Sequence, residues 1–149
     1  MHVHGLHLFP LAKFIVINQL KEHGITLRDL IILDEVNAVA AGYFEKKTMT
    51  ICLNLGVLEE FIPKYQITAD SRAEAMLRCA VAVVFEECYH ATHCSTELNT
   101  EPLACEYATK KARKIPVEML INMGGWFYQK LIKAGGAKMA GNKVNTNEP

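Results

Sequence analysis

The sequence has no excess of either charge and no long apolar run. Its 149 residues include sixteen basic and sixteen acidic side chains, so no overall field attracts nucleic acid or anionic lipid. No apolar stretch reaches the roughly 18–20 residues needed to span a bilayer. The first residues also lack the basic segment and apolar stretch of a secretion signal. We therefore expect a cytoplasmic protein that binds neither nucleic acid nor membranes.

Cysteine pairs at disulfide or zinc-site spacing are also missing. The five cysteines are odd in number and no two lie three residues apart, which favours reduced, buried thiols. Half of all residues are apolar, enough for the core of one compact domain. We expect that single domain over residues 1–133. Residues 134–149 show no periodicity, so we expect a disordered tail there.

The hydrophobic pattern predicts an α+β fold. Apolar residues at helical spacing predict a first helix, and Asp70 or Ser71 is placed to cap a long one. Between them, runs of β-branched and aromatic residues predict a strand and then a hairpin, although residues 27–34 also fit helical spacing. The expected elements are helix 11–23, strands 30–33, 37–44 and 48–55, a short helix 57–62, the long helix from 71, helix 101–114, and helix 117–133 with a weak point at Gly124-Gly125.

The most informative segment is Phe-Glu-Glu-Cys-Tyr-His-Ala-Thr-His, residues 85–93, which follows the apolar part of the long helix. At about 100° per residue, Glu86, His90 and His93 share one helix face, and Glu87 lies roughly a quarter-turn away. Ionisable side chains in such a buried helix cost about several kcal/mol unless they are paired or bound to metal. The spacing Glu-Glu-x-x-His is that of the zinc-peptidase motif His-Glu-x-x-His, with glutamate at the first ligand position.

Simpler interpretations of these residues stay open. Glu86 and Glu87 can be surface charges near the end of a helix, where His90 and His93 interact favourably with the helix dipole. Glu101 can be a first-turn acid of the following helix, stabilised in the same way. Half of a ferritin-like di-iron site would need a second Glu-x-x-His, and the chain has none.

The order of the parts resembles the zincin metallopeptidases, specifically compact gluzincins such as the ImmA/IrrE-like peptidases. Residues 42–44, Gly-Tyr-Phe, and 51–54, Ile-Cys-Leu-Asn, look like the strands that precede the active helix in that family. Residues 101–108, Glu-Pro-Leu-Ala-Cys-Glu-Tyr-Ala, look like its third-ligand frame Glu-x-x-Ala-Asp. The likeness covers residues 30–116. It implies a zincin-like fold, with a small, mostly antiparallel sheet packed on a buried active-site helix and further helices after it.

Carried over residue by residue, the resemblance implies a metal-dependent peptidase. Glu86, His90 and Glu101 would hold a divalent metal, zinc in the first instance, with His93 as an alternative ligand. Glu87 would be the general base that takes a proton from metal-bound water as the water attacks a peptide carbonyl. A protein or peptide substrate would pair with an edge strand, for which residues 48–54 are the candidate.

Two positions depart from the family pattern, since Glu86 replaces a histidine and Cys105 replaces Asp or Asn. Two carboxylates and one imidazole leave a bound dication nearly neutralised, so water on it would be less acidic. Oxygen ligands also favour Mn²⁺ or Fe²⁺ relative to zinc. The alternative function is therefore an inactive zincin scaffold that serves as a binding or structural module, of the kind that phages or mobile elements carry.

Overall fold

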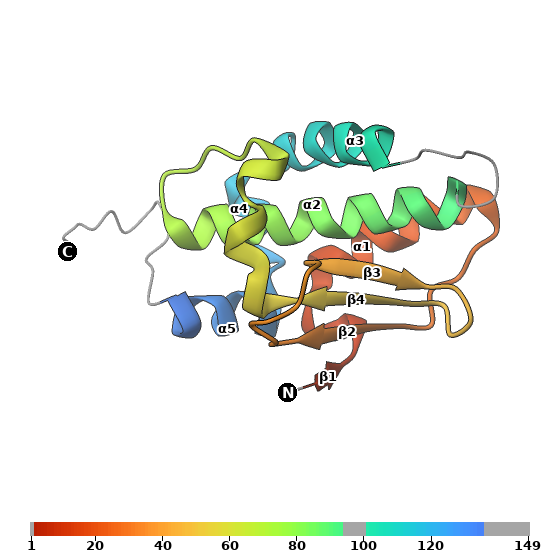
Figure 1. Ribbon diagram of the computed structural model, residues 1–149, viewed down its shortest axis with the longest axis horizontal. Helices are drawn as coiled ribbons and strands as arrows, with labels where there is room; N and C mark the ends of the chain where they lie inside the picture. The colour runs from red at the N-terminus through yellow and green to blue at the C-terminus, as the bar shows by residue number, and fades with distance from the viewer. Residues whose placement is uncertain (1, 94–100, 136–149) are drawn as a thin grey trace.

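A computed structural model describes residues 2–93 and 101–135 of the chain (Figure 1). Within these residues it is an α+β protein, as the sequence predicts, with a sheet packed against one long helix. The strands are β1 (His2–His4), β2 (Asp29–Leu33), β3 (Gly42–Glu45) and β4 (Thr50–Asn54); the helices are α1 (Pro10–Leu20), α2 (Arg72–His93), α3 (Glu101–Arg113), α4 (Val117–Asn122) and α5 (Gly125–Gly135); and 3-10 helices span Leu6–Leu8, Lys21–His23, Leu55–Phe61 and Pro63–Tyr65.

The described strands form a mixed sheet in the order β1-β2-β4-β3. β2 and β4 are parallel, whereas β1 with β2 and β3 with β4 are antiparallel. The sequence predicted a mostly antiparallel sheet with residues 48–54 at its edge. That edge assignment is wrong, because the hairpin inserts β4 between β2 and β3, so that β4 pairs on both sides. The edge strand beside α2 is β3 (Figure 1).

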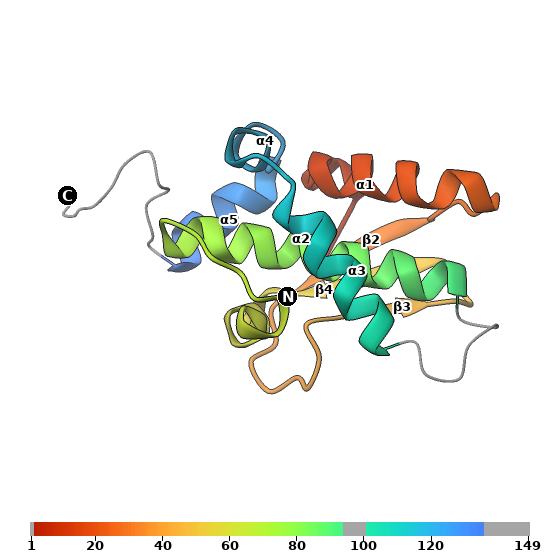
Figure 2. The same ribbon diagram turned by 90° about the horizontal axis from the view of Figure 1, so that it is seen from above.

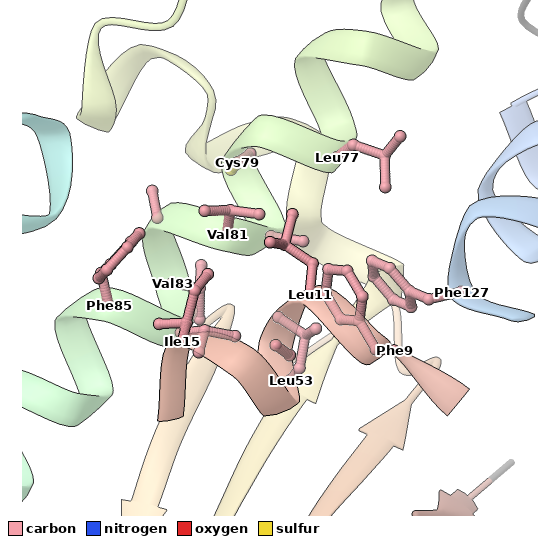
Figure 3. Packing of buried hydrophobic residues seen from close by; sticks show 14 of the residues in the cluster. Phe9, Leu11, Ile15, Leu53, Leu77, Cys79, Val81, Val83, Phe85 and Phe127 are labelled. Atoms are coloured by element: carbon pink, nitrogen blue, oxygen red, sulfur yellow. The ribbon is translucent and has the colours of Figure 1, made fainter. Parts of the chain in front are cut away.

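Helix α2 begins at the predicted cap. The amide of Glu74 donates to Ser71 Oγ at 3.1 Å, and the Glu74 carboxylate accepts from the amide of Asp70 at 3.3 Å. These bonds satisfy amide groups that a helix start leaves without partners. From residue 79 to residue 85 the helix is apolar and buried on every side, between α1 and β4 (Figure 3). α2 is therefore fixed along its length by the core.

Alternation along the strands separates two faces of the sheet. Leu30 and Ile32 of β2 belong to the core cluster beneath the helices, as do Ile51 and Leu53 of β4. The residues that alternate with these in β2 and β4 line a cavity of about 510 Å³ on the other face of the sheet. Residues of the β2–β3 loop line it as well. The strand interpretation of residues 30–33 is thus confirmed over the helical alternative.

Two other elements differ from expectation. The predicted strand 37–44 is paired only from Gly42 onward, and Val39 in the preceding loop is 95% exposed. The predicted helix 117–133 divides into α4 and α5 at Gly125, within its predicted weak point, where a φ of +59° favours glycine. A Cβ there would lie 2.6 Å from Cδ of Pro10, so packing against α1 adds to the break.

Residues 94–100, with Cys94, lie outside the described residues, as do positions 136–149 of the predicted tail. The other four cysteines are free thiols, as expected. None of the described helices is both long enough and apolar enough to cross a membrane.

Candidate metal centre

Three of the residues singled out in the sequence converge at one place. Glu86 and His90 lie one turn apart on α2, and Glu101 is the first residue of α3, which crosses α2 (Figure 2). One potential ligand atom from each lies within 4.8 Å of those of the other two. Among the described residues, this is the group of histidine, cysteine and carboxylate side chains that could hold a metal ion.

The spacing of this group suits a small divalent ion. His90 Nε2 lies 2.6 Å from Glu101 Oε1 and 3.6 Å from Glu86 Oε2. A tetrahedral ion with bonds of about 2.1 Å places its ligand atoms about 3.4 Å apart, so movements of about 1 Å would suffice. The Glu101 side chain is 62% exposed and has room to make them. The residues present therefore fit a divalent metal.

Glu86 is a buried anion rather than a surface charge, with 2% of its surface exposed. The hydroxyl of Tyr65 donates to Oε1 at 2.5 Å, and Lys64 Nζ donates to Oε2 at 3.1 Å. Burial raises the pKa of Glu86, but hydrogen bonds from His90 and Tyr65 and the charge of Lys64 outweigh it and lower the pKa to about 2. The surface-charge interpretation of Glu86 is thus wrong.

Lys64 and Tyr65 are site residues that the sequence reasoning missed. They belong to the 3-10 helix Pro63–Tyr65, and Cys105 Sγ of α3 contacts the carbonyl of Lys64 at 3.6 Å. More than twenty residues separate them from Glu86, so no local spacing links them. The only signal in the sequence was that a glutamate inside an apolar helix needs polar partners.

Glu87 lies beside the group and faces strand β3. A Cβ added at Gly42 of β3 would lie 3.7 Å from Cγ of Glu87 and 2.3 Å from Cγ1 of Val83, so the absence of a side chain lets β3 approach α2 closely. Burial is the largest influence on the pKa of Glu87 and, with the charges of Glu86 and Glu101, raises it to about 7 against the opposing effect of His90.

No hydrogen bond joins the carboxylate of Glu87, which is only 8% exposed, to another described residue. The side chain instead lines a cavity of about 520 Å³ together with the metal group and β3. This volume is within the usual range for sites that bind small ligands or segments of chain. A buried carboxyl group with a raised pKa at such a cavity is typical of a general base.

The structure does not bring His93 into the group. Its ring stacks on Tyr89 at 3.9 Å, and Nδ1 lies 2.9 Å from the carbonyl oxygen of Tyr89. It lines a different cavity, of about 490 Å³, with His23 and Lys111. An ideal helix places His93 on the face of Glu86, but the residues lie about 10 Å apart along the axis and the ring turns toward Tyr89.

Tyr43 lines the same cavity as Glu87, on the side of the edge strand. A hydrogen bond with Cys52, together with burial, raises the pKa of its phenol to about 12. Tyr43 therefore brings a neutral hydroxyl to the border of the cavity.

No family model, curated protein or solved structure matches this chain. The fold and the site together define an α+β protein with a candidate Glu-His-Glu metal group on its long helix.

Proposed function

We propose that the protein is a metal-dependent peptidase of the zincin type, with Glu86, His90 and Glu101 as ligands and Glu87 as general base. One observation carries the proposal: the ligand group, a buried carboxyl group without a hydrogen-bond partner among the described residues, and the edge strand β3 all border one cavity. This is the set of parts that peptide hydrolysis needs, because water must be activated next to an extended peptide.

A divalent ion, when bound, supplies a Lewis acid that polarises water and a carbonyl oxygen. Glu87 accepts the proton released when water attacks and then delivers it to the leaving amine. Burial is the largest influence that raises the pKa of this carboxyl group, which makes it a stronger base than an exposed glutamate. Tyr65 fixes Oε1 of Glu86, which leaves Oε2 directed at His90 as the ligand atom.

Zinc is the first expectation for the metal, and the carboxylate-rich set also accepts Mn²⁺ or Fe²⁺. The substrate is a peptide or protein segment that adds to the sheet at β3, where strand addition satisfies backbone groups and the alternate side chains give specificity. This replaces the earlier assignment of the substrate to residues 48–54, which form the central strand β4.

A second candidate function is an inactive binding or structural module. The hydrogen bond with Glu86 raises the pKa of His90 to about 9, so His90 and Lys64 balance the two carboxylates within the protein itself. A self-neutralised cluster of this kind can be purely structural. Against this stands Glu87, because a buried carboxylate that makes no hydrogen bond with the described residues adds nothing to such a cluster.

Elemental analysis of untagged protein purified without chelator tests the proposal. We expect about one equivalent of zinc, manganese or iron in the wild type and in His93→Ala. His90→Ala should lose the metal, because the site then lacks one of its three ligands. His93→Ala is the matched control, since it removes an imidazole from the same helix outside the group. Equal metal in wild type and His90→Ala would reject the ligand assignment, and no metal in either would favour the structural module.

A further inference from the structure

The ammonium group of Lys64 lies where the two carboxylates of the candidate metal group meet. Nζ is 3.1 Å from Oε2 of Glu86 and 3.8 Å from Oε2 of Glu101. The other oxygen of Glu86, Oε1, accepts the hydrogen bond of Tyr65 at 2.5 Å. Oε2 is thus the oxygen left for an ion, and it already carries the bond from Lys64.

The fold holds Lys64 in this position. Its side chain is 34% exposed, and Nζ lies 5.8 Å from the ring centre of Phe61 and 5.3 Å from that of Tyr65. Such contacts between a cation and aromatic rings are attractive. A lysine that pairs with a carboxylate carries its charge at neutral pH. The site therefore has a permanent cation of its own.

We infer that Lys64 competes with the divalent ion for Oε2 of Glu86 and so limits the affinity of the site for metal. The inference rests on the proposed function, because it assigns a regulator to the same ligand group. An ion at Oε2 must either displace Nζ or accept the repulsion of a positive charge within a few ångströms. Lys64 is a positioning residue here, because it acts on the ion through Oε2 of Glu86 rather than by contact with a substrate.

Calorimetric titration of Zn²⁺ and Mn²⁺ tests this competition in the wild type and in the variants Lys64→Met, Lys64→Arg and Lys46→Met. Methionine keeps the length of the side chain without its charge, and arginine keeps the charge. Lys46 is the matched control, because it is exposed, lines the same cavity and makes none of the described bonds to the ligand carboxylates. A second neutral variant, Lys64→Gln, guards against loss of the fold in Lys64→Met.

The neutral variants at position 64 should bind the ions about tenfold more tightly or better than the wild type, because a unit charge next to the ion is removed. The affinity of Lys64→Arg should stay within about threefold of that of the wild type, because arginine keeps the charge. The same holds for Lys46→Met, because the charge that it removes is exposed and screened by solvent. Binding by Lys64→Met must disappear when His90→Ala is added, which places the ion at the candidate group.

The outcomes separate the two proposals. If the wild type binds metal while folded Lys64→Met and Lys64→Gln bind it no more tightly, that result would overturn the competition by Lys64 but not the metal site. Binding in the neutral variants but not in the wild type would support it, with Lys64 closing the site. An equal gain in Lys46→Met would also overturn it, because any cavity charge would then act alike. No binding in any variant would overturn the metal site and the competition together.

Discussion

Helix α2 carries two clusters of buried charged side chains about two turns apart. The first cluster bonds to backbone carbonyl groups, and the second borders a cavity. In the first, Nη1 of Arg78 donates to the carbonyl oxygens of Ala112 at 2.9 Å and Ile115 at 2.6 Å. Nη2 lies 3.3 Å from Oε2 of Glu74 on the same helix. These bonds satisfy carbonyl groups at the end of α3, so this cluster ties the two helices together.

The second cluster consists of Lys64, Glu86, His90 and Glu101, and it borders the cavity of about 520 Å³. Its members also bond to one another, but they come from three segments and surround a space. Glu87, next to them, is buried without a hydrogen bond from the described residues. Polar side chains of this cluster therefore face the cavity, whereas those of the first cluster bond to the backbone.

The comparison shows that buried charge alone does not mark a functional site. Both clusters include a carboxylate on α2 that is less than a tenth exposed and paired with a cation. What distinguishes the second is that ligand atoms of several segments converge and that a carboxyl group beside them has a raised pKa. Stability and chemistry should therefore respond differently to changes in the two clusters.

The largest effect on stability is expected at the first cluster. Arg78→Met would leave Glu74 without its cation and would remove the donor to the carbonyl oxygens of Ala112 and Ile115, of which the first keeps only the amide of Ile115 at 3.3 Å. Breaking a buried pair from one side costs about 3–5 kcal/mol, so the free energy of unfolding should fall by that amount. Urea unfolding followed by circular dichroism measures it. Arg113→Met on exposed α3 surface is the control, expected to stay within about 0.5 kcal/mol. A loss below about 1 kcal/mol for Arg78→Met would remove the distinction between the clusters.

A smaller effect of opposite sign is expected at the second cluster. Glu87→Gln replaces a buried carboxylate by a neutral amide, so stability at pH 8 should stay equal or rise by about 1–2 kcal/mol. Metal content should not change, while any hydrolysis of a peptide mixture, followed by mass spectrometry, should disappear because glutamine accepts no proton. A clear loss of stability would mean that Glu87 supports the fold, as Arg78 does.

The smallest effect is expected at an exposed pair, which serves as the reference for both clusters. Arg72 donates to Glu59 at 2.9 Å and 2.5 Å, with 40% and 55% of the two side chains exposed. Such pairs contribute at most about 1 kcal/mol, so Glu59→Gln should lower the free energy of unfolding by no more than that at pH 7.

The pH dependence of this reference pair follows from its pKa. The hydrogen bond from Arg72 lowers the pKa of Glu59 below that of the unfolded chain. The contribution is then complete above the ordinary glutamate pKa of about 4.3 and disappears as the pH falls through the lower folded value. Unfolding curves of wild type and Glu59→Gln should converge in acid. A difference that grows on acidification would contradict the assignment.

Much of the fold could be predicted because the relevant signals are local. The cap at Ser71 and the end at Gly24 of the 3-10 helix that continues α1 depend on a few neighbouring residues, and Gly24 has a φ of +65°. The short length of β3 could not be predicted, because residues 37–41 have strand-like composition and only pairing with β4 decides where the strand begins. The placement of β4 at the centre of the sheet depends on pairing as well.

The candidate site was predictable to the extent that it lies on one helix. Glu86 and His90 are four residues apart, so a helix alone brings them to one face. Glu101 was found only through the resemblance, and Lys64 and Tyr65 were not found at all. His93 has the helical spacing of a ligand but lies outside the metal group, because its side chain packs on Tyr89.

The sequence by itself determined the long apolar helix, its cap, the alternation in β2 and β4, and the pairing of Glu86 with His90 on one helix face. Backbone sterics and helical spacing act within a few residues, and the order of residues is enough to set them. The tertiary structure decided that α3 delivers Glu101, that Pro63–Tyr65 delivers a cation and a hydroxyl to Glu86, and that β3 forms the edge beside Glu87. These contacts join segments far apart in the chain, and packing of the shared core selects them.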